Sequence, residues 1–128
     1  MSVLGIGVDV VHVPRIAALL SRRNPQRFAS RILSPQEAAQ THLLADPTFL
    51  AVRWAVKEAA YKALYPKFRP SWKDLTYHGL RNGHKPVLLY HPSPNNNLGD
   101  MHVSVSHDGE YVFASVLVQA SRPRADEW

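Results

Sequence analysis

The sequence contains no cysteine among its 128 residues. This absence excludes disulfide bonds, thiolate zinc sites and cysteine nucleophiles, and it is compatible with a reducing compartment. No apolar run reaches the roughly 18–20 residues that a bilayer-spanning helix needs, so we expect no membrane partner. The first residues also lack the basic region and long apolar stretch of a secretory signal. We therefore expect a cytoplasmic protein, or a mitochondrial matrix protein if the source is eukaryotic.

Acidic residues are fewer than basic ones, 10 against 15, and the formal net charge is +5. Such a surface attracts anions, so nucleic acids, phosphorylated small molecules and acidic proteins all fit the charge. The aromatic residues do not alternate with Lys and Arg along one strand, as a stacking platform for single-stranded nucleic acid requires. We therefore expect no nucleic-acid partner, although the charge alone keeps that hypothesis open.

The length and the hydrophobic fraction of 45% predict one folded domain, spanning 1–120, followed by a tail, 121–128. Period-two alternation predicts a strand over 3–12. One face of this strand carries Leu4, Ile6, Val8 and Val10. The other face carries Gly5, Gly7 and Asp9, which predicts open space beside the Asp9 carboxylate.

Three helices are expected next. Pro14 suits the first position of a short helix that Asn24-Pro25 ends. Ser34-Pro35-Gln36-Glu37 has the form of a capping box and predicts a helix from there to about Ala45. Apolar residues three and four positions apart predict the longest helix over 48–64, with Glu58 and Lys62 together on the side opposite the apolar stripe.

The second half of the chain has the pattern of strands. We expect strands over 75–80 and 85–90, joined by an Asn82-Gly83 turn, and two more over 101–106 and 111–119. The order of elements predicts an α+β fold, an antiparallel sheet packed with helices that include a long central one.

Several motifs fail when their context is considered. Gly5-Ile6-Gly7 lacks the third glycine of a dinucleotide-binding turn. Ser106-His107-Asp108 cannot form a catalytic triad, because adjacent strand residues face opposite ways. The histidines do not have zinc-site spacing.

Asp9, Glu58 and Lys62 leave two interpretations open. Asp9 alone fits a solvated strand residue, and Glu58 and Lys62 alone fit an ordinary surface pair one helical turn apart. If the two carboxylates meet, however, they could hold Mg²⁺ and leave positions for substrate phosphates, while the lysine neutralises a phosphate oxygen.

Five segments, in chain order, resemble holo-[acyl-carrier-protein] synthases of the 4′-phosphopantetheinyl transferase family. The longest match is the family's W/F-x-x-K-E-A-x-x-K helix. The segments are GIGVDVV at 5–11, QRFASRIL at 26–33, FLAVRWAVKEAAYKA at 49–63, KP at 85–86 after a turn, and HVSVSH at 102–107. Five matches in register are far more specific than one.

The resemblance implies the transferase fold and the transfer of 4′-phosphopantetheine from coenzyme A to a serine of an apo acyl carrier protein. Mg²⁺ would be required, and adenosine 3′,5′-bisphosphate would be released. Asp9 and Glu58 match the family's metal ligands, and Glu58 also matches the base for the carrier serine. Lys62 matches the residue that faces the coenzyme A phosphates. The catalytic residues implied are therefore Asp9, Glu58 and Lys62.

The resemblance also implies where the substrates bind. The coenzyme A residues would be Arg53, Lys57, Lys62, Gly83, Lys85, Pro86, Ser104, Ser106 and His107. The carrier protein would dock on Arg15, Arg22, Arg27, Phe28 and Arg31. Relatives of this length are homotrimers with active sites between subunits, which we expect here too. The chain departs from the family at His84 and in the loops 65–70 and 92–99, and the type of carrier is left open.

Overall fold

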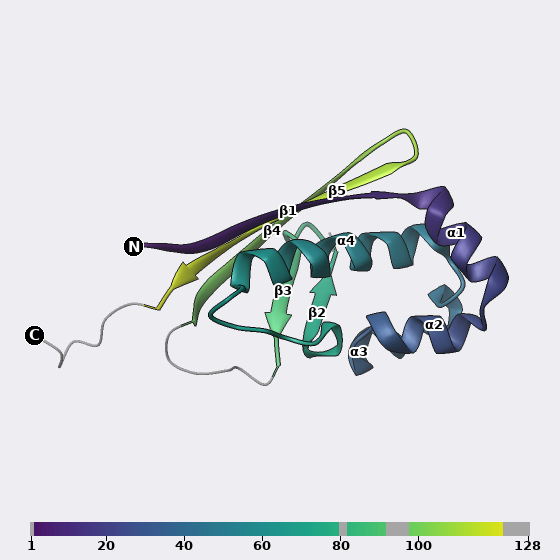
Figure 1. Cartoon of the computed structure of the whole chain (residues 1–128), viewed down its shortest axis with the longest axis horizontal. Helices are drawn as coiled ribbons and strands as arrows, with labels where there is room; N and C mark the ends of the chain where they lie inside the picture. The colour runs from purple at the N-terminus through teal and green to yellow at the C-terminus, as the bar shows by residue number, and fades with distance from the viewer. Residues whose placement is uncertain (1, 80–81, 92–97, 122–128) are drawn as a thin grey trace, which may run out of the picture.

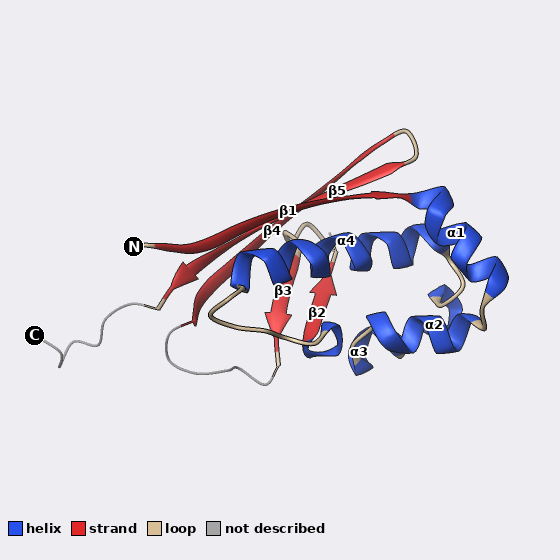
Figure 2. Cartoon of the chain, in the orientation of Figure 1, coloured by secondary structure: helices blue, strands red, loops and turns tan. Residues whose placement is uncertain are grey.

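A long helix lies across one face of a three-stranded antiparallel sheet, and smaller helices gather at one end of it (Figures 1 and 2). The computed structural model describes residues 2–79, 82–91 and 98–121. The predicted α+β class, with helices packed on antiparallel strands, is confirmed. The predicted tail lies outside the described residues, apart from Ser121.

The main sheet has the strand order β1-β5-β4. Its strands are β1 (Val3–His12), β4 (Leu98–Asp108) and β5 (Tyr111–Ala120). The central row of this sheet joins Asp9, Ala114 and Val105. A tight turn at Gly109, where φ is 58°, connects β4 to β5. The first and last strands thus pair within one sheet.

The expected single sheet is divided in two. Strands β2 (Leu75–His78) and β3 (Val87–Tyr90) form a separate two-stranded antiparallel sheet. Both are shorter than predicted. The expected turn is present, with positive φ at Asn82 (50°) and Gly83 (79°), but the ladder closes only at His78 and Val87. The connection is therefore longer than a two-residue hairpin.

The prediction about the faces of β1 is wrong. The glycine face packs against the long helix α4 (Pro47–Leu64), whose backbone comes so close that a Cβ on Gly7 would overlap the Ala59 carbonyl oxygen. There is accordingly no open space beside the glycines of this face. The apolar face points outward instead, with Ile6 64% and Val8 55% exposed. Period two separates the two faces of a strand, but it does not say which face the next layer will cover.

Three short helices precede α4. They are α1 (Val13–Arg22), α2 (Pro25–Ile32) and α3 (Pro35–Ala38), with 3₁₀ turns at Thr41–Leu43 and Trp72–Asp74. Helix α2 was not predicted. Asn24-Pro25 ends α1 as expected, but the Asn24 side chain also accepts hydrogen bonds from the amides of Gln26 and Arg27 and so begins α2.

The helix expected over 34–45 is only one turn, α3, followed by a 3₁₀ turn. Its start is as predicted, because Ser34 and Glu37 form the reciprocal capping box. The central helix α4 has the expected position and begins at the N-cap Asp46. It is buried on most of its circumference, since the sheet covers one side and the α1–α3 layer and β2 cover others. No helix in the described ranges is long and apolar enough to cross a membrane.

Candidate functional site

The carboxylate on β1 meets the lysine at the end of α4. Asp9 lies on the β1 face that packs against α4, and the Nζ atom of Lys62 is 3.5 Å from its Oδ1 atom. The same ammonium donates a 3.0 Å hydrogen bond to the Val8 carbonyl oxygen. Glu58 precedes Lys62 by one helical turn and therefore shares its flank of the helix. Packing of β1 on α4 thus brings Lys62 to Asp9, and the helical spacing sets Glu58 on the flank that carries Lys62.

These three groups keep contact with solvent. The Asp9 side chain is 18% exposed and that of Lys62 53%, while Glu58 is half-buried. Among the described residues, the Glu58 carboxylate has neither an ion-pair partner nor a side-chain hydrogen bond. Two carboxylates of this kind suit Mg²⁺, which binds oxygen ligands and commonly keeps waters and substrate phosphates in its other positions. The donor set of Asp9 and Glu58 therefore fits the implied metal.

No group of three or more His, Asp or Glu side chains with metal-binding geometry occurs in the described part of the chain. An ion held by Asp9 and Glu58 would therefore take its remaining ligands from water or substrate.

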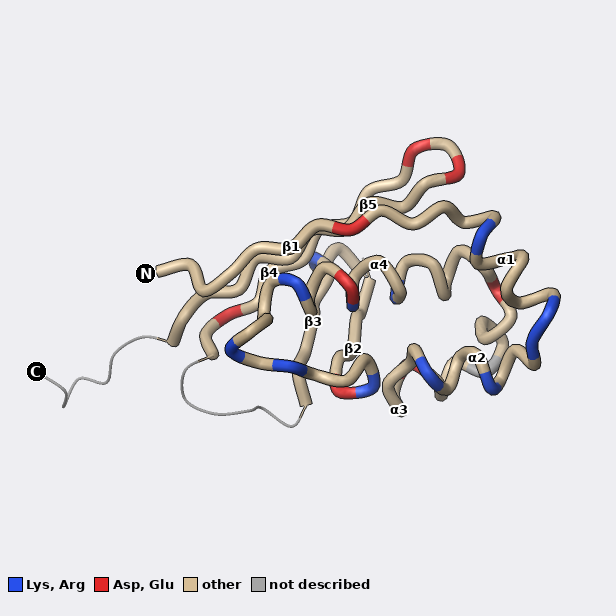
Figure 3. The backbone as a smooth tube through the Cα atoms, viewed as in Figure 1, with Lys and Arg blue, Asp and Glu red and all other residues tan. Residues whose placement is uncertain are grey.

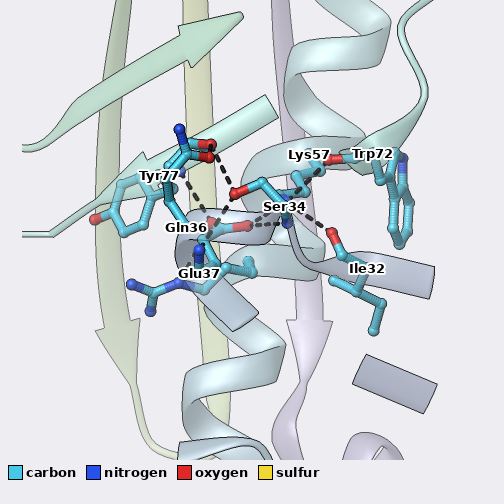
Figure 4. Close-up of polar contacts among 9 residues, drawn as sticks. Ile32, Ser34, Gln36, Glu37, Lys57, Trp72 and Tyr77 are labelled. Atoms are coloured by element: carbon cyan, nitrogen blue, oxygen red, sulfur yellow. Dashed lines mark hydrogen bonds and ion pairs between the residues drawn. The ribbon is translucent and has the colours of Figure 1, made fainter. Parts of the chain in front are cut away.

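The prediction that Lys57 contacts coenzyme A is wrong. The Lys57 side chain is fully buried beneath α2 and α3. Its ammonium donates to Glu37 Oε1 at 2.5 Å and to the carbonyl oxygens of Ile32 at 2.6 Å and Trp72 at 3.0 Å (Figure 4). All three of its protons are used inside the chain, so none remains for a ligand. Lys57 joins four segments of the fold.

Glu37 is the acceptor at the centre of this buried network. Beyond Lys57, it accepts hydrogen bonds from the amides of Ser34 at 2.9 Å and Tyr77 at 3.0 Å (Figure 4). Arg53 approaches it with Nε 3.7 Å from Oε2. Burial lowers the pKa of Lys57 and of Arg53, and the charge of Glu37 opposes both shifts. The network ties α3 and β2 to α4.

The Arg53 side chain packs against two aromatic rings and is mostly buried. Its guanidinium lies 3.9 Å from the Phe49 ring centroid and 5.1 Å from that of Tyr77, and its side chain is only 12% exposed. Its buried Nε atom has no hydrogen-bond partner in the described residues. Contact between Arg53 and coenzyme A stays a prediction.

Two other predicted coenzyme A residues lie on the opposite face of the main sheet from Asp9. Ser104 and Ser106 are exposed on the outer face of the main sheet, whereas Asp9 is on the inner face. Gly83 and Lys85 are exposed and Pro86 is half-buried in the β2–β3 connection. One chain by itself therefore does not bring all these residues round the Asp9 carboxylate.

His107 lies on the inner face, at the end of β4, and lines a pocket of about 440 Å³. Val13 and Pro14 of α1, Pro47 of α4 and Tyr111 of β5 also line this pocket.

Four of the five predicted carrier-binding residues gather at the corner between α1 and α2, where Lys and Arg positions are concentrated (Figure 3): Arg22, Arg27, Phe28 and Arg31. A pocket of about 300 Å³ there is lined by Arg22, Arg23, Asn24, Arg27, Phe28 and Arg31. Phe28 is only 6% exposed, because its ring stacks on Trp54 at 6.1 Å between centroids. Arg15 covers another part of Trp54, 5.9 Å from the ring centroid. Trp54 lies one turn before Glu58, so this basic corner adjoins the carboxylates.

Two contributing residues were not among the predicted site residues. Glu37 was recognised only as part of a capping box, and no local pattern indicates that it also pairs with a lysine 20 positions later. Arg23 lines the basic pocket beside Arg22.

Comparison with known proteins supports the predicted family. The family model described as the 4′-phosphopantetheinyl transferase superfamily matches residues 5–115. A holo-[acyl-carrier-protein] synthase from Cereibacter sphaeroides is 36% identical, with 96% of each chain covered, and one from Desulfovibrio desulfuricans is 37% identical, with 92% of this chain and 98% of the relative covered.

Solved structures agree. The synthase from Neisseria meningitidis has a TM-score of 0.79 at 30% identity and covers 92% of this chain and 99% of its own. That from Helicobacter pylori, solved in complex with coenzyme A, has a TM-score of 0.73 at 28% identity, covering 89% and 99%. The family inferred from the five sequence segments is thus confirmed, and the chain belongs to the 4′-phosphopantetheinyl transferase superfamily, in its holo-[acyl-carrier-protein] synthase group.

Proposed function

We propose that this protein transfers the 4′-phosphopantetheine group of coenzyme A to a serine of an apo acyl carrier protein, with release of adenosine 3′,5′-bisphosphate. The observation that carries the proposal is the contact between Asp9 and Lys62 on a solvent-accessible flank of α4, a flank that Glu58 shares because it precedes Lys62 by one helical turn. Membership of the superfamily supplies the reaction class.

The carboxylate of Glu58 takes the proton of the carrier serine, whose Oγ atom then bonds to the phosphorus that bears pantetheine. The bond between that phosphorus and the bridging oxygen breaks, and adenosine 3′,5′-bisphosphate leaves with the electron pair. Lys62 stabilises the charge on the leaving oxygen or protonates it. Mg²⁺, held by Asp9 and Glu58, would neutralise phosphate charge when bound.

We assign the basic corner between α1 and α2 to the carrier protein. Arg22, Arg27 and Arg31 present positive charge there, and carrier proteins are acidic, so the charges steer the two together. The corner contacts Trp54, one turn from Glu58, which suits delivery of a serine to that carboxylate.

A homotrimer with active sites between subunits fits the surface of the main sheet. Its outer face exposes Ile6, Val8 and Val10 of β1 and Phe113 of β5, an apolar group that a second copy could cover. Ser104 shares that outer face, while Asp9 lies on the inner one. The outer face of the sheet in a neighbouring copy, which carries Ser104, could therefore lie near Asp9 and Glu58 of the first copy. Sedimentation at several concentrations measures this assembly.

The decisive experiment is to incubate the protein with coenzyme A, Mg²⁺ and a panel of apo carriers and to weigh each carrier. We expect one carrier to gain the mass of one phosphopantetheine group. Glu58→Gln should abolish the gain while the fold persists, because the base and a metal ligand are lost together. Asp100→Asn, an exposed carboxylate on β4, is the matched control and should retain activity. If no carrier gains mass, or if Glu58→Gln is fully active, the assignment is wrong.

A further inference from the structure

Helix α2 is joined to the long helix α4 by two contacts. Midway along α2, the Phe28 ring stacks on Trp54 of α4 with 6.1 Å between centroids. At the end of α2, the Ile32 carbonyl oxygen accepts a 2.6 Å hydrogen bond from the buried ammonium of Lys57 (Figure 4). We propose that Lys57 is a positioning residue, which through the Ile32 carbonyl holds α2 so that its arginines receive the acyl carrier protein beside Glu58. The inference rests on the function proposed above.

The end of α2 needs a donor such as Lys57. The last carbonyl groups of a helix have no partner within it, and a cation close to them is stabilising. In α2 the Leu33 amide donates to the Ala29 carbonyl oxygen, whereas the Ile32 carbonyl oxygen receives Lys57. Ile32 is only 2% exposed, so water is a poor substitute for the lysine. Loss of Lys57 would therefore loosen the end of α2 from α4.

The two anchored residues of α2 set the direction of its arginines. Phe28 and Ile32 are four positions apart and both buried, so they form one stripe of the helix. Arg27 and Arg31 each precede an anchored residue by one position, and both are exposed. They therefore form a second stripe, about 100° further round the helix. A tilt or rotation of α2 would move both arginines at once, relative to Glu58.

Lys57 is well placed to fix this relation, because it directly precedes Glu58 in α4. Its other two hydrogen bonds go to Glu37 of α3 and to the Trp72 carbonyl oxygen. The Trp72 ring also meets Trp54 edge-on, with 5.1 Å between centroids. Both contacts between α2 and α4 are thus connected to the segment at Trp72. The ammonium is held at a defined point, and the end of α2 is held with it.

Steady-state kinetics of Lys57→Met, at a temperature where the variant is folded, test this role. The value of kcat/KM for the carrier should fall at least about five-fold, as on loss of one well-placed interface contact. KM for coenzyme A should stay within about two-fold. Val118→Ala is the destabilised control, since it removes buried methyl groups where β5 pairs with Gly5, at the end of the sheet away from α2 (Figure 1). It should keep kcat/KM for the carrier within about two-fold.

A double-mutant cycle separates positioning from a general loss of stability. Arg31→Ala should lower kcat/KM for the carrier at least about five-fold in the wild type and less than about two-fold in Lys57→Met, because the arginine is already displaced there. Arg15→Ala, on α1, is the control and should have the same effect in both backgrounds. If Lys57→Met does not fold, Lys57→Met, Glu37→Gln replaces it. That double variant leaves no buried carboxylate charge but still leaves the Ile32 carbonyl without its lysine.

Equal effects of Arg31→Ala in both backgrounds would overturn the inference, as would a KM for coenzyme A that rises together with that for the carrier. Calorimetry with the apo carrier panel separates the inference from the proposed function. If the wild type binds a carrier without modifying it, and Lys57→Met weakens that binding at least about five-fold, the proposed function fails and the positioning role stands. If the wild type modifies a carrier and Lys57→Met does so equally well, the function stands and the role fails. If the wild type binds no carrier, the role fails.

Discussion

Replacing the buried lysine of α4 by methionine should destabilise the protein strongly. Lys57→Met keeps the length of the side chain but removes its charge and three hydrogen bonds, to Glu37, Ile32 and Trp72. Glu37 would then be a buried carboxylate, 1% exposed, without its closest cation. Removing one partner of a buried ion pair costs about 3–5 kcal/mol, because the other charge stays desolvated.

The contacts that Glu37 would keep place the expected loss of stability near the lower end of this range. Glu37 would keep the amides of Ser34 and Tyr77 and the guanidinium of Arg53 at 3.7 Å. We therefore expect a loss of about 3 kcal/mol. A domain of this size is stable by roughly 5–15 kcal/mol, so the variant should still fold.

Urea unfolding at fixed protein concentration measures this loss; the concentration matters because self-association adds to apparent stability. The double variant Lys57→Met, Glu37→Gln removes both charges, and its cost should be smaller than the sum of the two single costs by about 2 kcal/mol. Lys62→Met is the matched control on the same helix and should cost less than about 1 kcal/mol, since its pair with Asp9 is exposed.

Two results would refute this reasoning. If Lys57→Met lowers the free energy of unfolding by less than about 1 kcal/mol, the other partners of Glu37 are enough to compensate its buried charge. If the costs of Lys57→Met and Glu37→Gln simply add, the two side chains do not depend on each other, and the network is not the link between α3 and α4.

Two further predictions concern packing and pH. Gly7→Ala should lower the free energy of unfolding in urea by about 3 kcal/mol, because the new methyl group would overlap the Ala59 carbonyl oxygen and push β1 from α4. Gly79→Ala is the control, since its Cβ would have ordinary contacts. Equal losses in the two variants would contradict the packing argument. Burial raises the pKa of Tyr77 above its usual value near 10. Above pH 10 the folded state therefore keeps a proton that the unfolded state loses. The stability that Tyr77 contributes at lower pH is lost as the pH rises through the folded pKa. The free energy of unfolding should therefore fall more steeply above pH 10 for the wild type than for Tyr77→Phe, and parallel pH profiles would count against it.

The accuracy of the sequence predictions depended on the range of the interactions involved. The helix over 48–64 and the capping box at Ser34 were predicted closely, because helical periodicity and cap hydrogen bonds join residues three or four apart. Helix α2 was missed because Asn24-Pro25 serves as a terminator and as an N-cap at once. The open space predicted on the glycine face of β1 is filled by α4 beside Gly5 and Gly7, since alternation does not specify which layer will cover a face.

By itself, the sequence determined that Glu58 and Lys62 share one flank of a long helix, because their spacing equals one helical turn. Together with the resemblance in five segments, it also determined the family. Only the tertiary structure decided that Lys62 meets Asp9, 53 positions earlier, and that Lys57 is occupied by Glu37 and cannot serve a ligand. Those outcomes follow from the packing of α4 on a glycine-lined strand and beneath α3. Such contacts join distant segments, so no local pattern of residues encodes them.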